Sequence, residues 1–175
     1  MIIVPKQRGR LFFYDETDIC QPPNAPSKID SPGQNQVRYL PGSVEYPTGE
    51  GLYEIYPKKR NEEVSQHLAH LLEMCDGDFC FVVWDNASQH ITPMLFPFLC
   101  DNSQRLMMVN LPTYSPHLNE IEKLWWYMRD TITRNHFVQT FGGLCQALTG
   151  CLERLPFSRF CSLMGITPRG QPLAA

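Results

Sequence analysis

The sequence predicts an α/β fold in which helices flank a mixed β-sheet. Two observations lead to this prediction. The first part of the chain contains short apolar runs separated by turn-forming residues, which is typical of an antiparallel meander. From about residue 61 onward, apolar runs of strand length alternate with segments whose apolar residues recur every three or four positions, as in amphipathic helices.

The first predicted strand, residues 11–14, is an aromatic-rich apolar run that is followed directly by Asp15. Residues 21–34 hold four prolines and a glycine, which predicts an irregular loop. Residues 37–44 and 52–56 are predicted to form two further strands, because a proline and two glycines between them favour a turn.

The second half alternates helices and strands. Residues 61–75 show helical periodicity, with Asn61 as the predicted N-cap. Residues 80–84 form a buried strand that again ends at an acid, Asp85. The later elements are predicted in the order short helix 92–99, strand 106–111, helix 119–133 opened by Asn119, and helix 141–155. We expect residues 1–10 to be an N-terminal extension, 11–155 the core and 156–175 a C-terminal tail.

Composition limits the functional classes. A length of 175 residues fits one domain, and the net charge of -3 excludes nucleic-acid binding through overall basic charge. Seven cysteines without a C-x-x-C pair argue against structural zinc and indicate reduced thiols in the cytoplasm. Apolar runs are too short to span a bilayer, so no membrane partner is expected.

Three acids belong to three predicted core elements. Asp15 and Asp85 each follow a buried strand, and Glu122 lies in the first turn of the helix that Asn119 opens. Each has a structural interpretation when taken singly, because Asn-x-x-Glu resembles a capping box and Asp is common where strands end. Together they suggest a site for Mg²⁺, which prefers a few carboxylates and several waters. Two such ions can activate a nucleophile and stabilise the leaving oxygen of a phosphodiester.

Three segments also carry a family resemblance. Residues 11–17, 82–90 and 111–125 resemble the three catalytic blocks of the mariner-like superfamily of DDE transposases, in its bacterial insertion-sequence branch. The third block is the most specific, because Tyr-Ser-Pro, Leu-Asn and Ile-Glu occur together in it. Thirty-six residues separate Asp85 from Glu122, close to the mid-thirties usual in the family.

This resemblance implies a ribonuclease-H-like core in which Asp15, Asp85 and Glu122 form the catalytic, metal-binding triad. It implies two Mg²⁺ ions, with Mn²⁺ as a substitute. The implied reaction is cleavage of DNA at transposon ends, followed by strand transfer into target DNA. The implied partners are these DNAs, a helix-turn-helix region encoded separately or missing, and a second copy in a homodimer. The implied location is the cytoplasm, with nucleoid association in a bacterium.

Further residues match the family blocks as supporting or DNA-contacting positions: Glu16, Asn86, His90, Tyr114, Ser115, Asn119, Lys123 and Trp125. His90 has an alternative interpretation as a hydrogen-bonded loop residue. Trp125 and its neighbour Trp126 are candidates to stack on a base, although tryptophans within a helix more often belong to the core.

The sequence also departs from the family pattern. His117 replaces the usual acid, Glu120 replaces the usual proline, and residues 17–33 lack the usual tryptophan segment. These departures leave two alternatives to an active transposase. One is a catalytically inactive remnant or an accessory DNA-binding subunit. The other is an unrelated ribonuclease-H-like nuclease that acts on RNA or on repair intermediates.

Overall fold

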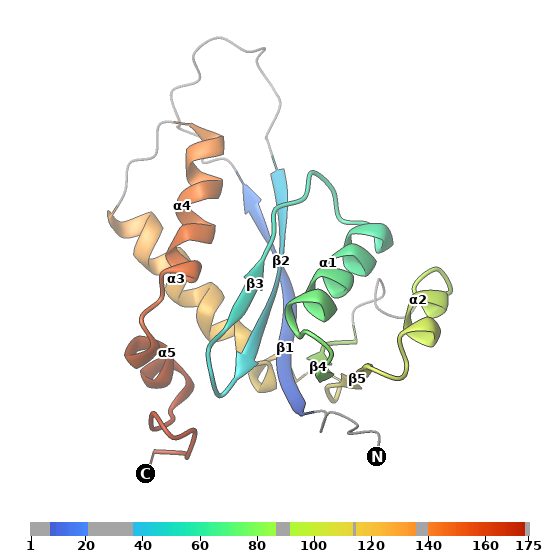
Figure 1. Ribbon diagram of the computed structural model, residues 1–175. Helices are drawn as coiled ribbons and strands as arrows, with labels where there is room; N and C mark the ends of the chain where they lie inside the picture. Colours follow the sequence, from blue (N-terminus) through green and yellow to red (C-terminus); the bar gives the residue numbers. More distant parts are fainter. Residues whose placement is uncertain (1–7, 21–36, 87–91, 114, 136–139, 174–175) are drawn as a thin grey trace, which may run out of the picture.

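The computed structural model describes residues 8–20, 37–86, 92–113, 115–135 and 140–173, without the side chains of 116 and 133–135. Its centre is one five-stranded mixed sheet in the order β3-β2-β1-β4-β5 (Figure 1). The strands are β1 Gly9–Cys20, β2 Val37–Tyr46, β3 Gly51–Tyr53, β4 Phe79–Trp84 and β5 Leu106–Asn110. Strands β1 to β3 pair antiparallel, whereas β1, β4 and β5 pair parallel, which confirms the predicted mixed sheet.

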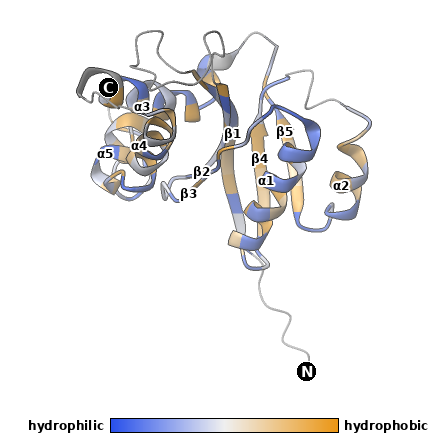
Figure 2. Ribbon diagram, turned by 90° about the horizontal axis from the view of Figure 1, so that it is seen from above, coloured by the Kyte–Doolittle hydropathy of each residue, from blue (hydrophilic) through white to orange (hydrophobic). Residues whose placement is uncertain are grey.

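Helices cover both faces of this sheet, as Figure 2 shows. Helices α1 (Asn61–Met74) and α2 (Phe96–Asp101) lie on one side. Helices α3 (Ile121–Asn135), α4 (Phe141–Glu153) and α5 (Phe157–Met164) lie on the other, and a short 3₁₀ turn, Pro116–Leu118, leads into α3. Each side has its own buried apolar cluster, so the sheet separates two cores.

Strand β1 is longer than the sequence predicted. It pairs with β4 from Gly9 to Phe13 and with β2 from Leu11 to Cys20. The prediction that the strand ends before Asp15 was wrong, because β2 supplies hydrogen-bond partners for the polar residues beyond it. Asp15 therefore lies within β1, at the place where the pairing with β4 ceases.

The alternation of side chains along β1 assigns them to the two cores. Phe12 and Tyr14 belong to the cluster beneath α1. Asp15 and Thr17 face the other way, where they accept hydrogen bonds from Trp125 and Arg129 of α3. The period of two thus places the first predicted catalytic acid on the face that α3 covers.

Several helix ends differ from the predictions. Helix α1 begins at Asn61, and the N-cap position belongs to Arg60, which makes no side-chain capping bond, so Asn61 is not the N-cap. Helix α2 begins at Phe96 instead of residue 92, because Pro97 favours the first turn of a helix. Helix α3 begins at Ile121, two residues after Asn119.

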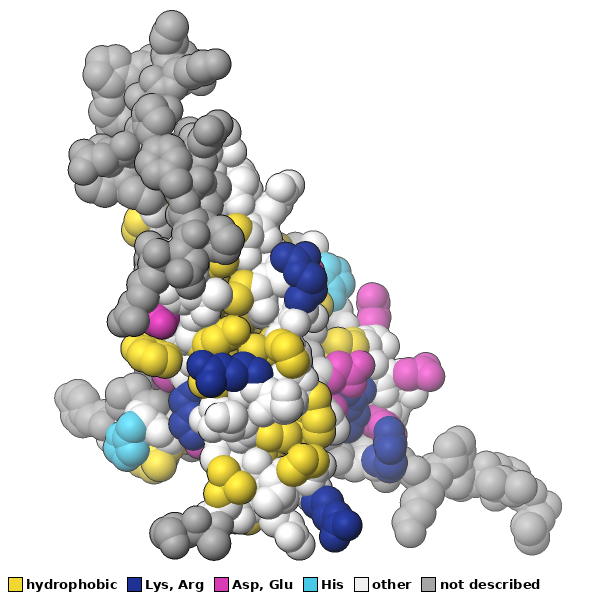
Figure 3. All heavy atoms as spheres, turned by 90° about the vertical axis from the view of Figure 1, so that its left-hand side faces the viewer, with side chains coloured by type: hydrophobic (Ala, Val, Ile, Leu, Met, Phe, Trp, Pro, Cys, Tyr) yellow, Lys and Arg dark blue, Asp and Glu magenta, His cyan; other side chains and the backbone are white. Residues whose placement is uncertain are grey.

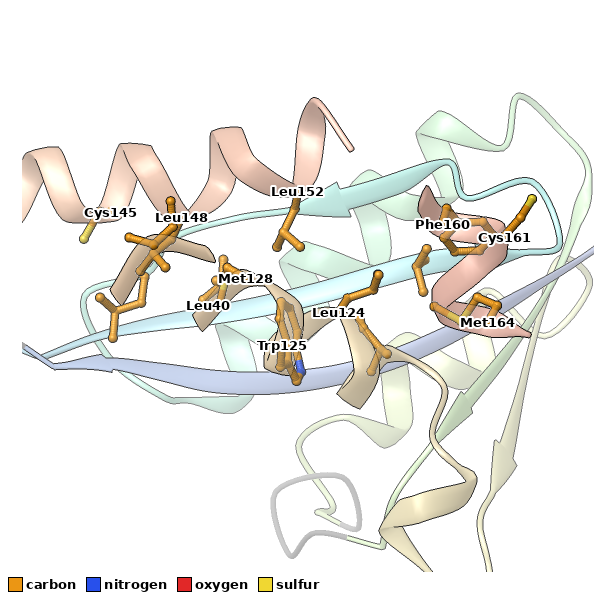
Figure 4. Close-up of a cluster of buried hydrophobic side chains, with 14 of the residues drawn as sticks. Leu40, Leu124, Trp125, Met128, Cys145, Leu148, Leu152, Phe160, Cys161 and Met164 are labelled. Carbon is orange, nitrogen blue, oxygen red and sulfur yellow. The ribbon is translucent and has the colours of Figure 1, made fainter. Parts of the chain in front are cut away.

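Residues 156–173 are not a loose tail. Pro156 occupies the N-cap position of α5, and Gly165 ends the helix with a φ of 67°, a left-handed conformation that glycine adopts without strain. The buried face of α5 contributes Phe160, Cys161 and Met164 to the cluster formed with α3 and α4 (Figure 4). The C-terminal segment therefore completes the core. At the other end of the chain, β1 begins at Gly9, within the expected extension.

All seven cysteines are free thiols, of which four are buried. In the described ranges no helix combines the length and apolar character needed to cross a membrane.

The contribution of α5 to stability can be measured with two matched substitutions. Phe160 is 2% exposed and Phe157 is 45% exposed. We expect Phe160→Ala to lower the free energy of unfolding by about 3–5 kcal/mol, because it leaves a cavity in the core. Phe157→Ala should cost less than about 1 kcal/mol. Urea denaturation measures both, and equal losses would contradict the placement of α5.

Candidate active site

The pairing of β1 with β4 determines where two of the predicted acids lie. The parallel register ends at Phe13 opposite Val83, and Asp15 and Asp85 each follow two residues later. Neighbouring strands are about 4.8 Å apart. Because both acids lie two residues past the last parallel pair, the register places them side by side at the same end of the pairing. Asp85 is partly exposed there, directly after β4.

Glu122 approaches Asp15 from the first turn of α3. The pKa of Asp15 is raised to about 7, first because the carboxyl is buried and further because the negative charge of Glu122 is near. Hydrogen bonds from the Glu16 backbone and from the Trp125 indole act in the opposite direction and lower this pKa. The Trp125 Nε1–H donates to Asp15 Oδ2 at 3.0 Å. The structure therefore brings Asp15 and Glu122 into electrostatic contact.

Asn119 and Arg129 hold α3 against β1 on either side of Asp15. The Asn119 amide donates to the carbonyl of Tyr14 at 2.9 Å, and Arg129 donates to Thr17 Oγ1. Asn119 Oδ1 is buried and accepts no hydrogen bond from any residue that the structure describes. The predicted capping box was therefore wrong, because the Asn119 side chain bonds β1 instead of the first turn of α3.

Trp125 is in the core and 1% exposed, so it cannot stack on a base while α3 stays packed. Its ring lies between α3 and the strands (Figure 4), over Gly42 of β2, the residue that pairs with Asp15. A Cβ atom at Gly42 would lie 2.5 Å from Trp125 Cη2 and 2.9 Å from Tyr53 Cδ1. Sequence reasoning missed Gly42. The available signal was a glycine inside a predicted strand, which often marks a place where another group packs closely against the backbone.

Most of the other residues that were predicted to support the site or contact DNA form local contacts. Asn86 Nδ2 donates to the carbonyl of Leu111 at 2.5 Å and so ties the segment after β4 to the end of β5. Lys123 of α3 forms an ion pair with Glu120, the residue just before this helix. Ser115 Oγ donates to the carbonyl of Thr113 at 3.4 Å within its own turn. His90 and Tyr114 lie outside the described residues.

Glu16 lies on the opposite face of β1 from Asp15. Its side chain is buried, accepts a hydrogen bond from the Tyr14 hydroxyl at 2.6 Å and lies 3.4 Å from the Lys59 ammonium. These contacts support β1 from the α1 side. Glu16 is therefore not in a position to share a ligand with the Asp15 carboxylate.

A further polar cluster lies on the α1 side. His67 Nε2 is 2.9 Å from Ser43 Oγ, and His67 Nδ1 is 2.6 Å from Glu54 Oε2. The order of serine, histidine and carboxylate matches that of a nucleophilic triad. Ser43 and His67 are fully buried, so no substrate reaches the hydroxyl, and the cluster instead joins α1 to β2 and to Glu54, which directly follows β3.

The donor chemistry of the three acids fits a hard divalent cation. Carboxylate oxygens are the protein ligands that Mg²⁺ and Mn²⁺ prefer. A bound cation would relieve the repulsion between Asp15 and Glu122 that contributes to the raised pKa. In the part of the chain that the structure describes, no three His, Cys, Asp or Glu side chains lie close enough together to hold a metal. The effect of Glu122 on the pKa of Asp15 shows that these two acids are near each other, whereas Asp85 is placed beside Asp15 by strand register alone.

Comparison with known families identifies the class of protein. Residues 10–145 match the family described as DDE superfamily endonuclease, so the chain belongs to this family. The 39 kDa protein of insertion element IS630 from Shigella sonnei is 28% identical over 162 residues, which cover 84% of this chain and 46% of that protein. Protein y4pE/y4sA of Sinorhizobium fredii is 31% identical over 104 residues, covering 59% of this chain and 73% of that protein. The chain thus spans about half the length of the Shigella relative.

Solved structures share the fold. The catalytic domain of Mos1 mariner transposase superposes with a TM-score of 0.60 at 13% identity, covering 89% of this chain and 75% of that domain. The HTLV-2 integrase catalytic core in complex with magnesium gives a TM-score of 0.51 at 14% identity, with 95% of both chains covered. The fold is the ribonuclease-H-like fold of transposase and integrase catalytic domains, as the sequence resemblance implied.

The raised pKa of Asp15 makes stability depend on pH. The unfolded chain releases this proton near pH 4, whereas the folded chain keeps it until about pH 7. The contribution of Asp15 to stability is therefore complete at low pH and is lost as the pH rises from about 4 to about 7. Asp15→Asn stays uncharged, so we expect it to be more stable than the native chain at pH 8 by a few kcal/mol.

Urea denaturation in metal-free buffer at pH 4, 6 and 8 measures this difference. Asp101→Asn, on the exposed end of α2, is the matched control and should leave the pH profile unchanged. A parallel pH profile for Asp15→Asn and the native chain would show that Asp15 titrates normally.

Gly42 can be tested in a similar way. Gly42→Ala should destabilise the protein by about 1–3 kcal/mol, because the rigid Trp125 ring must move. It should also change the near-ultraviolet circular dichroism of that ring. Gly142→Ala is the control, since nothing lies within 4 Å of a Cβ atom at that position in α4. If both substitutions are neutral, Trp125 does not pack on Gly42.

Proposed function

We propose that this chain is the catalytic domain of an insertion-sequence transposase, which cleaves DNA strands and transfers them in a reaction that depends on Mg²⁺ or Mn²⁺. The observation that carries the proposal is the approach of Glu122 to the partly buried Asp15, with Asp85 beside it in the strand register. Membership of the DDE superfamily endonucleases supports the reaction class.

Asp15, Asp85 and Glu122 would hold the metal, in the arrangement of two ions that the sequence resemblance suggests. The bound metal would supply an activated water or hydroxyl and would stabilise the leaving oxygen of the phosphodiester. The chain itself fixes the Asp15 carboxylate through the Trp125 N–H bond to Oδ2. It fixes the start of α3, and with it Glu122, through the bond from Asn119 to Tyr14.

The protonation state of Asp15 controls whether the site can bind a metal ion. With a pKa of about 7, this carboxyl is largely protonated at pH 6 and ionised at pH 8 when no metal is bound. A carboxylate must be ionised to bind a cation, so metal affinity and metal-dependent activity should increase through this pH range. The hydrogen bond from Trp125 favours the ionised form of Asp15 and so favours metal binding.

DNA is the proposed substrate. Solved relatives include the Mos1 strand transfer complex and the Mos1 paired end complex with Mn, with TM-scores of 0.63 and 0.62. On the face that carries α4 and α5, Lys and Arg side chains are scattered among hydrophobic ones and form no single patch (Figure 3). Arg10 is engaged by Glu45 and Glu50. We assign recognition of transposon ends to a separate helix-turn-helix region, as the family resemblance implies.

A plasmid-nicking assay tests the proposal. We expect the native chain to convert supercoiled plasmid to open circle with Mg²⁺ or Mn²⁺ and not with EDTA. Asp85→Ala and Glu122→Gln should each lower the rate at least about 100-fold, the scale of losing one electrostatic stabiliser of a transition state. Asp101→Asn should retain the native rate, because this acid lies on the exposed end of α2.

The alternatives give different outcomes in this assay. Equal nicking by the native chain and Asp85→Ala, or none by either, would identify an inactive remnant or accessory subunit. Faster cleavage of an RNA–DNA hybrid than of duplex DNA would favour the ribonuclease-H-like nuclease. Strand transfer requires a separate measurement, in which a labelled oligonucleotide becomes joined to plasmid.

A further inference from the structure

The two adjacent tryptophans of α3 have opposite environments. Trp125 is 1% exposed, whereas Trp126 is 62% exposed. A helix turns by about 100° per residue, so one of two neighbours can face the core while the other faces solvent. Here the core side of α3 is formed by Leu124, Trp125 and Met128. An exposed indole is the exception, because tryptophan is highly buried on average.

Trp126 shares its face of the helix with Glu122. The exposed residues of α3 include Glu122, Trp126 and Arg129, which follow one another at steps of four and three. Side chains at such steps are neighbours, with Cβ atoms about 5–6 Å apart. Helical side chains also lean toward the N-terminus, so the Trp126 ring covers surface on the Glu122 side of its own Cα.

We propose that Trp126 stacks on a nucleobase of the DNA strand that is cut at this site, and that it does so where the base has left the duplex stack. This inference rests on the proposed function. An aromatic ring stacks on any base through its flat face and needs no particular sequence. A base within an intact duplex already stacks on its neighbours, so the ring gains most from a frayed or single-stranded end.

The charges beside Trp126 favour a nucleic acid over an apolar partner. On the N-terminal side lies Glu122, the proposed metal ligand. A metal ion bound there would hold a phosphate of the DNA. On the C-terminal side lies Arg129, an exposed residue whose guanidinium also donates to Thr17 and is thereby oriented. An aromatic face between an anion-binding site and a cation suits a sugar-phosphate chain with one base turned toward the protein.

Binding measurements in buffer with Ca²⁺, a cation that carboxylate oxygens also bind, test this inference apart from the Mg²⁺- or Mn²⁺-dependent reaction. Fluorescence anisotropy would compare a blunt duplex with a duplex that has three mismatched pairs at one end. We expect the native chain to prefer the frayed duplex and Trp126→Ala to bind it about 5- to 100-fold more weakly. Trp126→Phe should recover most of this loss, because phenylalanine also stacks. Phe157→Ala, an exposed aromatic on α5, should bind as the native chain does.

Intrinsic fluorescence gives a second, direct measurement. Trp84 and Trp125 are buried and donate to Asn110 and Asp15, so Trp126 is the exposed emitter. Addition of the frayed duplex should quench the emission of the native chain. In Trp126→Ala the quenching should be absent, and an abasic site at the frayed position should abolish it in the native chain.

Three results would overturn the inference. Native affinity and unchanged end preference in Trp126→Ala, alongside nicking that is lost in Asp85→Ala, would reject base stacking and leave the proposed function intact. A change in oligomeric state of Trp126→Ala with unaltered DNA binding would show that a second copy of the chain covers the indole. No DNA binding and no nicking by the native chain would reject the proposed function itself.

Discussion

The candidate site depends on the packing of Trp125 between α3 and the sheet. This one side chain contacts Gly42 of β2, belongs to the core shared by α3, α4 and α5, and donates a hydrogen bond to Asp15. Because the indole is buried, α3 cannot turn about its axis without opening that core. The same contact therefore sets both the position of Glu122 near Asp15 and the outward direction of Trp126.

Two neighbouring acids on opposite faces of β1 have different surroundings, because one stabilises the fold and the other belongs to the candidate site. On the α1 face, the buried Glu16 has partners in Tyr14 and Lys59. On the α3 face, Asp15 is partly buried near another carboxylate, and desolvation and this charge raise its pKa to about 7. A carboxyl that is destabilised in its charged form is expected where a cation or a proton is to be bound. The cost to folding is thus concentrated at the residue that the proposed reaction requires.

The local sequence pattern predicted most of the helices and strands. It failed where contacts with residues far away in the chain determine the structure. The strands β2 to β5 follow from short apolar runs and the turn residues between them, and the helices α1, α3 and α4 follow from apolar residues at steps of three and four. The extension of β1 through its acidic half needed β2 as a partner. The segment after Pro156 was predicted to be a tail, and it forms α5 because its apolar face packs into the core. Asn119 resembled a helix cap, but its amide bonds β1 instead.

By itself, the sequence determined which residues could carry the chemistry: three acids, their spacing, and the blocks that match the DDE family. These are properties of neighbouring residues along the chain, and they need no knowledge of the fold. Only the tertiary structure decided which of these residues meet. Strand register placed Asp15 and Asp85 at the same end of the sheet, and the angle at which α3 packs buried Trp125 and exposed Trp126. Gly42 gains its role solely from a ring more than eighty positions away in the chain. Register and facing arise from long-range packing, which no local pattern encodes.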